Sequence, residues 1–217
     1  MQIIIVANGV LEPEINLALW AKRSDLLIAA DGGADHCVVA GVVPDVVIGD
    51  LDSISEAVLN KLNVHDCKII SYPIEKDFTD LELALRYAAD KGNGEIVILG
   101  ALGGRLDMSM ANLMLLGADF LKNRIRIVAG NQEAMLLREG HKVTIQGDVG
   151  DIVSLLPLGR DAKGVTTTGL RYLLNNETLF FTATKGVSNE LTSKTATIQL
   201  NSGLLLCIHC SHPNLNV

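Results

Sequence analysis

The first part of the chain alternates short, unbroken apolar runs with stretches long enough for amphipathic helices. An unbroken apolar run is typical of a strand that is covered on both faces, and an intervening helix is what a parallel connection requires. The pattern therefore predicts an α/β domain with a doubly wound, mostly parallel sheet. Its strands are expected at residues 3–7, 26–30, 46–48, 68–71, 96–99 and 125–129.

Two helix starts in this part have the form of a capping box, in which Ser or Thr is followed three residues later by Glu. Thr79 precedes Glu82 in this way, and Ser53 precedes Glu56. Behind Thr79, apolar residues recur at helical spacing. We expect helices to begin at both places.

The second part of the chain has a different composition. Only Thr79 of the eleven threonines precedes residue 133, and short alternating apolar runs follow that point. β-Branched residues in alternating runs favour antiparallel strands. We therefore expect two domains: residues 1–132 as the α/β domain and residues 133–217 as an all-β sandwich.

Composition excludes several classes of protein. The formal net charge is −7, which argues against a main partner that is a nucleic acid, because nonspecific binding needs a basic face. The apolar runs are far shorter than the roughly 18 residues that span a bilayer. The four cysteines are too scattered for a disulfide scaffold, and no basic leader precedes the first apolar run. These features predict a cytoplasmic protein with no membrane partner.

In a doubly wound sheet, ligands bind beyond the carboxyl ends of the strands. Five successive strands are followed here by glycine, carboxylate or both, at residues 8–9, 31–33, 49–53, 76–80 and 100–107. Carboxylates that converge repel one another, so they need a cation. Oxygen ligands without histidine or thiol favour Mg²⁺. The candidate ligands are Asp50, Asp52 and Asp80.

The same segments supply what a polyphosphate needs. Gly32, Gly103 and Gly104 would let backbone N–H groups approach phosphate oxygens, and Lys76 and Arg105 would neutralise their charge. Each residue alone also fits a turn, a cap or a solvated loop, so only the combination indicates a phosphate site. Neither the P-loop motif nor G-x-G-x-x-G is present, which argues against an ordinary P-loop enzyme or a dinucleotide oxidoreductase.

Taken in order, these motifs resemble the thiamine pyrophosphokinase family. The resemblance rests on Ala-Asp-Gly-Gly-Ala at 30–34, Gly-Asp-Leu-Asp-Ser at 49–53, Lys-Asp-Phe-Thr-Asp-Leu-Glu at 76–82 and Gly-Gly-Arg-Leu-Asp at 103–107. In the second part, residues 169–172, 186–190 and 203–205 also fit. The match extends over most of the chain.

The resemblance implies an enzyme that transfers the terminal diphosphate of ATP to the hydroxyethyl oxygen of thiamine and releases AMP. It implies a homodimer whose active sites lie between the α/β domain of one subunit and the β-sandwich of the other. It also implies that Mg²⁺ is held by Asp50, Asp52 and Asp80, with Asp31 and Asp107 in the same polar site.

The remaining substrate contacts are implied in the same way. Lys76 and Arg105 match positions suited to ATP phosphates, and Tyr172 falls where a ring would stack on the thiazolium cation. Ser188 and Asn189 match a polar pair near that substrate. In one departure, Met108 stands where the family usually has histidine, so the hydrogen bonds of an imidazole are missing there.

Two other functions remain open at this point. The apolar run that ends in Asp50-Leu51-Asp52 resembles the nucleophile loop of haloacid-dehalogenase phosphatases, in which Asp50 would attack phosphorus. That hypothesis leaves the glycine–arginine loop and the β domain unexplained. A nonenzymatic thiamine or nucleotide sensor is the second alternative, with Met108 as the mark of lost turnover. The residues do not identify a general base, for which Asp31 and Asp107 are the candidates.

Overall fold

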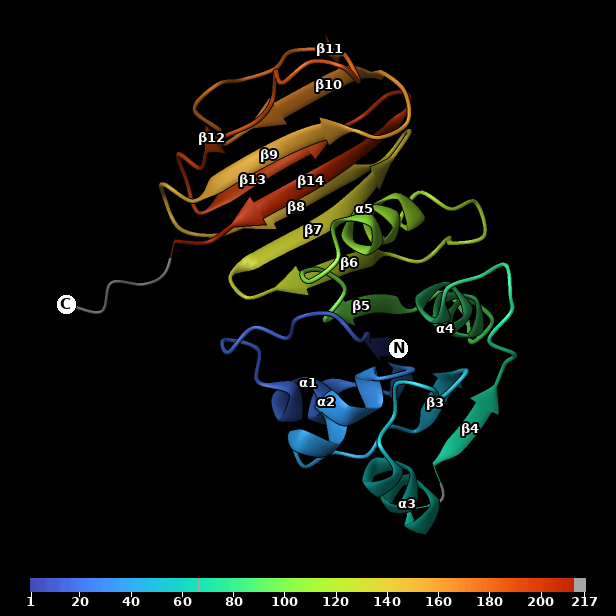
Figure 1. The fold of residues 1–217 in the computed structure, drawn as a ribbon. Coiled ribbons are helices and arrows are strands. Elements are labelled where there is room, and N and C mark those ends of the chain that lie inside the picture. The colour runs from blue at the N-terminus through green and yellow to red at the C-terminus, as the bar shows by residue number, and fades with distance from the viewer. Residues whose placement is uncertain (66, 213–217) are drawn as a thin grey trace, which may run out of the picture. The chain divides into compact units, whose positions relative to one another are not determined.

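The computed structural model describes residues 1–65 and 67–212, and the chain divides into two compact units, Met1–Gly130 and Asn131–Val217. Figure 1 shows the helices and strands of both units. No helix in the described residues is long and apolar enough to cross a bilayer.

The first unit is built on six strands in the order β6-β5-β1-β2-β3-β4, and all five pairings between them are parallel. The predicted parallel sheet is therefore confirmed, with a strand at each of the six apolar runs. The strands are β1 (Gln2–Val6), β2 (Leu26–Ala30), β3 (Val46–Gly49), β4 (Lys68–Ser71), β5 (Glu95–Leu99) and β6 (Ile125–Ala129).

Helices connect these strands and bury both faces of the sheet. On one face, α1, α2 and α3 pack with alternate strand residues such as Ile4, Leu27 and Val47 in a single buried cluster. A further helix, α4, contacts β1, β2 and β3. Its buried residues include Leu85. The helices are α1 (Leu17–Arg23), α2 (Gly33–Val39), α3 (Glu56–Val64), α4 (Asp80–Ala89) and α5 (Leu106–Leu115).

One of the two predicted capping boxes gives the start of its helix correctly. Thr79 is the N-cap of α4, and its Oγ1 accepts a hydrogen bond of 3.2 Å from the backbone N–H of Glu82. The prediction at Ser53 is wrong, because α3 begins at Glu56 with Ser55 as its N-cap. The Ser53 hydroxyl instead donates a hydrogen bond to Asp52 Oδ1 at 3.0 Å. Ser53 is therefore part of the turn before the helix and does not cap it.

The second unit is a sandwich of two antiparallel sheets, with strand orders β12-β9-β14-β7 and β11-β10-β13-β8. Buried residues from both sheets, such as Leu155, Val165, Ile198 and Leu205, form one core. This confirms the predicted antiparallel β architecture. The strands are β7 (Gln132–Arg138), β8 (Lys142–Gln146), β9 (Ile152–Pro157), β10 (Ala162–Thr168), β11 (Glu177–Leu179), β12 (Asn189–Glu190), β13 (Thr195–Gln199) and β14 (Leu204–Cys210).

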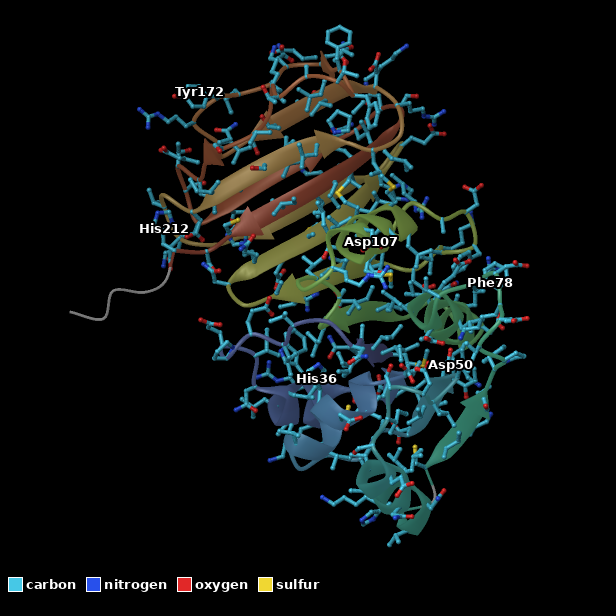
Figure 2. The ribbon with its side chains drawn as sticks, in the orientation of Figure 1. His36, Asp50, Phe78, Asp107, Tyr172 and His212 are labelled. Carbon is cyan, nitrogen blue, oxygen red and sulfur yellow. The ribbon has the colours of Figure 1, made fainter. Side chains whose placement is uncertain are left out.

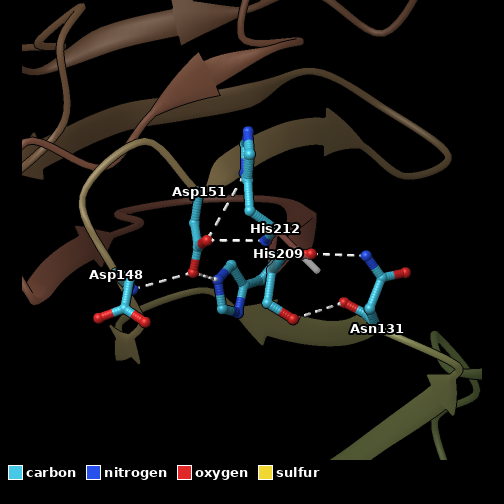
Figure 3. A network of polar contacts seen from close by, with 6 residues as sticks. Asn131, Asp148, Asp151, His209 and His212 are labelled. Atoms are coloured by element: carbon cyan, nitrogen blue, oxygen red, sulfur yellow. Dashed lines mark hydrogen bonds and ion pairs between the residues drawn. The ribbon is translucent and has the colours of Figure 1, made fainter. Parts of the chain in front are cut away.

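A buried carboxylate fastens the end of β14 to the turn before β9. Asp151 is 2% exposed and accepts from His209 Nε2 at 2.9 Å and from the backbone N–H groups of Asp148 and His212 (Figure 3). Burial alone would raise the pKa of Asp151, but these donors outweigh it and hold the pKa below its ordinary value. The network stabilises the ionised form of Asp151.

Candidate active site

A cavity of about 610 Å³ lies at the carboxyl ends of the strands of the first unit. The residues that follow β1, β2, β3 and β5 line it, together with the segment that leads into α4. In the strand order, β1 lies between β5 and β2, so the chain passes to opposite sides of β1 in the two halves of the sheet. Such a reversal is where open α/β sheets bind ligands.

Three carboxylates from three different elements meet in this cavity. Asp31 follows β2, Asp50 follows β3 and Asp80 is the first residue of α4. One oxygen of each lies within 4.8 Å of one oxygen of the others, which is close enough for a shared cation. Parallel pairing of β2 with β3 brings Asp31 beside Asp50, and the backbone N–H of Asp31 donates to Ile48 O at 2.9 Å.

Lys76 supplies the positive charge that faces this group. Its Nζ lies 2.7 Å from Asp50 Oδ2 and 3.0 Å from Asp80 Oδ1. The hydrogen bond from Lys76 lowers the pKa of Asp50, whereas burial raises the pKa of Asp80 against the opposing effect of the same ammonium. Burial also opposes the charge on Lys76, but the two carboxylates outweigh it and raise the pKa of the ammonium.

The three carboxylates are also arranged to bind a divalent cation, in addition to their contact with Lys76. Asp31 is 5% exposed, and its Oδ1 has no hydrogen-bond partner among the described residues. A buried carboxylate oxygen without a donor is costly, so it favours a cation. Asp31 and Leu51 also have positive φ angles, +46° and +69°, which are uncommon for residues with side chains and concentrate at functional sites.

Asp52, the third predicted ligand, does not join this group. Asp52 is exposed and lines the cavity, its Oδ1 accepts a hydrogen bond from the Ser53 hydroxyl, and its backbone N–H donates to Asp50 Oδ1 at 3.4 Å. Leu51, between Asp50 and Asp52, has a positive φ, and the group is completed by Asp31 with Asp50 and Asp80. From the sequence, Asp31 was predicted only to lie in the polar site. Its position directly after β2, the strand that pairs with β3, was the signal that its carboxylate could lie beside Asp50.

Arg105 and Asp107 lie at the start of α5: Arg105 is the N-cap residue of this helix, and Asp107 belongs to its first turn. Arg105 lines the cavity and pairs with Asp107 through two nitrogens, with Nε 3.1 Å from Oδ1. The pairing lowers the pKa of the Asp107 carboxyl, and both side chains are mostly exposed. Gly103 and Gly104 have φ angles of +87° and +70°, so the backbone just before α5 suits glycine. Asp107 contacts Arg105 and is not among the residues that line the cavity.

The cavity wall also contains residues that the sequence analysis gave no role. Phe78 lines it next to Lys76, and Asn112 lines it from α5 with Nδ2 donating to Ala101 O at 2.7 Å. Met108 is a third wall residue. Gly32 is not among the lining residues, but a Cβ at that position would lie 2.5 Å from the side chain of Asn8, which does line the cavity. In Figure 2, Asp50 and Phe78 are both labelled on the first unit.

The predicted substrate residues of the second unit are close to one another. Asn189 is 4% exposed, and its amide bonds the backbone of Tyr172 twice, at 2.9 Å to the N–H and 2.7 Å to the carbonyl. The Tyr172 side chain is 63% exposed, with Arg171 Cζ 5.7 Å from its ring centroid. Ser188 has a φ of +57°, and its N–H donates to Ser154 Oγ. Asn189 therefore orients Tyr172.

A doubly wound domain with a carboxylate-lined cavity at its strand ends, followed by a β-sandwich, defines the class: a two-domain α/β enzyme that handles a charged small ligand. Comparison with known proteins identifies the family within that class. Residues 17–129 match the sequence model described as "Thiamin pyrophosphokinase, catalytic domain", and residues 140–205 match "Thiamin pyrophosphokinase, vitamin B1 binding domain".

Individual relatives agree. The chain is 31% identical to the thiamine pyrophosphokinase of Bacillus subtilis over 94% of this chain and 96% of the relative. The crystal structure of a Bacillus subtilis thiamine pyrophosphokinase superposes with a TM-score of 0.85, over 98% of this chain and 100% of that one, at 31% identity. The structure from Geobacillus thermodenitrificans gives 0.84 at 29% identity, over 99% of both chains. The chain belongs to the thiamin pyrophosphokinase family, which gives no support to the aspartyl phosphatase hypothesis.

Proposed function

We propose that this protein transfers the terminal diphosphate of ATP to the hydroxyethyl oxygen of thiamine, giving thiamine diphosphate and AMP. The observation that carries the proposal is the meeting of Asp31, Asp50 and Asp80 around Lys76 in a cavity at the strand ends. Family membership across both units supports the choice of the two substrates.

Asp50 and Asp80, with Asp31 as the third carboxylate, are the residues that would hold Mg²⁺. The unpartnered Asp31 Oδ1 and the closeness of the three oxygens support this assignment. Bound there, Mg²⁺ would neutralise charge on the diphosphate during transfer. Asp52, at the edge of the cavity, remains a predicted ligand that a binding measurement can compare with Asp31.

Lys76 and Arg105 would act on the phosphates themselves. Transfer requires the alcohol oxygen to approach the β-phosphorus in line with the bridging oxygen that leaves with AMP. Lys76 is held at the cavity by two carboxylates, so its charge is already in place. Arg105 is exposed at the start of α5 and would exchange Asp107 for a phosphate oxygen. Both charges would stabilise negative charge that builds on the leaving oxygen.

Tyr172 would provide an aromatic face for the thiazolium cation of thiamine. Its exposed ring and the two hydrogen bonds that fix its backbone to Asn189 support this role. A cation over such a ring gains about 0.5–2 kcal/mol. Ser188 would contribute its hydroxyl from the neighbouring position.

We also propose a homodimer in which each active site uses the α/β unit of one subunit and the β-sandwich of the other. An apolar stripe on α5 supports an interface, because Leu106, Met110 and Met114 recur at helical spacing and are 78%, 47% and 56% exposed. The site would be incomplete in a lone subunit. A cytoplasmic location fits the four free cysteines, since reducing compartments keep thiols unpaired.

The first experiment is an assay for AMP and thiamine diphosphate with ATP, Mg²⁺ and thiamine. We expect both products from the wild-type protein and a loss of at least about 100-fold in kcat for Asp50→Asn, with unchanged circular dichroism. Asp148→Asn, which removes an exposed carboxylate of the second unit, should be fully active. Binding of thiamine or ATP without formation of AMP would favour the hypothesis of a nonenzymatic sensor. Covalent-like modification of Asp50 by beryllofluoride would favour the aspartyl phosphatase hypothesis.

A further inference from the structure

The guanidinium of Arg86 lies between two aromatic rings. Its Cζ is 4.6 Å from the ring centroid of Phe78 and 4.3 Å from that of Phe120. Both distances are within the range of cation–π contacts, and a planar guanidinium suits stacking on two faces better than an ammonium does. The three side chains therefore form one stack, Phe78–Arg86–Phe120.

A carboxylate fixes the orientation of this guanidinium. Arg86 donates from Nε at 3.0 Å and from a terminal nitrogen at 2.7 Å, both to Glu82 Oε1. Glu82 and Arg86 lie one turn apart on α4, and Glu82 is also the residue whose N–H is capped by Thr79. The stack is therefore anchored to the first turns of the helix that begins with Asp80.

The two rings come from segments that are far apart in the sequence. Phe120 lies in the connection between α5 and β6, whereas Phe78 lies in the segment between β4 and α4, residues 72–79, which contains no helix or strand. That segment carries Lys76 and has exposed apolar side chains at Tyr72 and Ile74. An irregular, exposed segment needs a fixed contact to hold one conformation, and Phe78 in the stack provides one.

We infer that Arg86 is a positioning residue: by clamping Phe78 against Phe120, it fixes the segment that brings Lys76 to Asp50 and Asp80. The inference rests on the proposed function, in which Lys76 meets the phosphates of ATP. Phe78 also lines the cavity, so the stack sets part of the wall that ATP would contact. Arg86 itself is not among the residues that line the cavity.

The main test uses Arg86→Met, which keeps a long apolar side chain but removes the positive charge and the planar guanidinium with its hydrogen-bond donors. We expect the KM for ATP to rise about 5–10-fold, with the KM for thiamine within about twofold of wild type, because the segment that carries Lys76 and Phe78 loses one of the contacts that fix it. Arg86→Lys should restore only part of the loss, since an ammonium cannot stack as a plane. A purely structural role would lower stability and shift both KM values together.

Phe120→Leu provides a second variant at the far side of the stack. It should raise the KM for ATP in the same direction, and the double variant with Arg86→Met should show less than the sum of the two effects, because both changes break one stack. The matched control is Lys91→Met, which removes a cation 4.3 Å from the Tyr87 ring outside the cavity. The control should leave both KM values unchanged.

Binding of ATP with Mg²⁺, measured by calorimetry without thiamine, separates this inference from the proposed function. A wild-type protein that binds ATP but forms no AMP would overturn the function, while weaker ATP binding in Arg86→Met would still support the clamp. Equal ATP affinity in wild type, Arg86→Met and Phe120→Leu would overturn the clamp, whatever the activity. An equal loss of affinity in Lys91→Met would also overturn it.

Discussion

At the scale of single residues, Asp31, Asp50 and Asp80 show that the role of a carboxylate depends on the residues around it. The residue types and their places after strands predicted a cation site, and Asp50 and Asp80 do meet. The choice between Asp31 and Asp52 as the third member depended on where the backbone places each carboxylate, and the positive φ angles of Asp31 and Leu51 follow from no simple sequence pattern. Asp52 lies two residues from Asp50 in the sequence, whereas Asp31 follows the strand that pairs with the one before Asp50.

A comparison of these two residues tests the cation site. Asp31→Asn should weaken Mn²⁺ binding by about tenfold or more, because it removes a buried, unpartnered oxygen from the group. Asp52→Asn should weaken it less, since its exposed carboxylate lies outside the group. Titration of Mn²⁺ by electron paramagnetic resonance measures both. The reverse order of effects would make Asp52 the ligand.

A second residue-scale prediction concerns Asp151 in the second unit. The pKa of this carboxyl is lowered in the folded state, so the stability it contributes is complete above its unfolded pKa of about 3.9 and is lost as the pH falls through the lower folded pKa. Asp151→Asn should therefore lower the free energy of unfolding at pH 7 by about 1.5–3 kcal/mol. Urea unfolding should show this difference shrinking below about pH 4.

Asp148→Asn is the matched variant for that measurement. Asp148 contacts Asp151 through its backbone: its N–H donates to Asp151 Oδ2 (Figure 3) and its carbonyl accepts from the Asp151 N–H, while its side chain is exposed. Its removal should leave the free energy of unfolding within about 0.5 kcal/mol of wild type. A pH-independent difference for Asp151→Asn would show that the network owes little to the charge.

At the scale of elements, the two capping boxes explain what a local pattern can predict. Thr79 starts α4 because its hydroxyl finds the free N–H of Glu82 in the next turn. Ser53 has the same spacing to Glu56, but it lies in a turn from Leu51 to Ile54, closed by the Ile54 N–H donating to Leu51 O at 3.4 Å, and α3 begins only at Glu56. The capping-box pattern was therefore wrong at Ser53, where the residues form a turn next to the candidate site and do not begin a helix.

The cap at Thr79 predicts a measurable effect on α4. Thr79→Ala should lower the free energy of unfolding of the first unit by about 1 kcal/mol, because the N–H of Glu82 loses its acceptor. Thr79→Ser should retain most of it, since a serine hydroxyl caps as well. Urea unfolding followed by circular dichroism gives both values. Equal losses in the two variants would mean that the methyl group, not the hydroxyl, matters.

At the scale of the whole molecule, shared active sites make a sharp prediction. In an equal mixture of Asp50→Asn and Tyr172→Ala proteins, each of which has lowered activity alone, half of the dimers formed at random are mixed. If each site uses both subunits, one of the two sites in a mixed dimer has no lesion, so about a quarter of wild-type activity should return. Sites built within single chains would return none, and sedimentation would show whether dimers form.

The sequence by itself determined the strands, the α/β and β architecture and the family. Unbroken apolar runs of this short length, bounded by turn residues, favour strands buried on both faces, and the motifs of the family occur in order along the chain. Tertiary structure alone decided that Asp31 joins Asp50 and Asp80, that Lys76 faces them, and that Phe120 reaches Arg86. Those contacts depend on strand order and on local backbone conformation, including the left-handed conformations of Asp31 and Leu51. Together they bring close side chains whose spacing along the chain carries no such information.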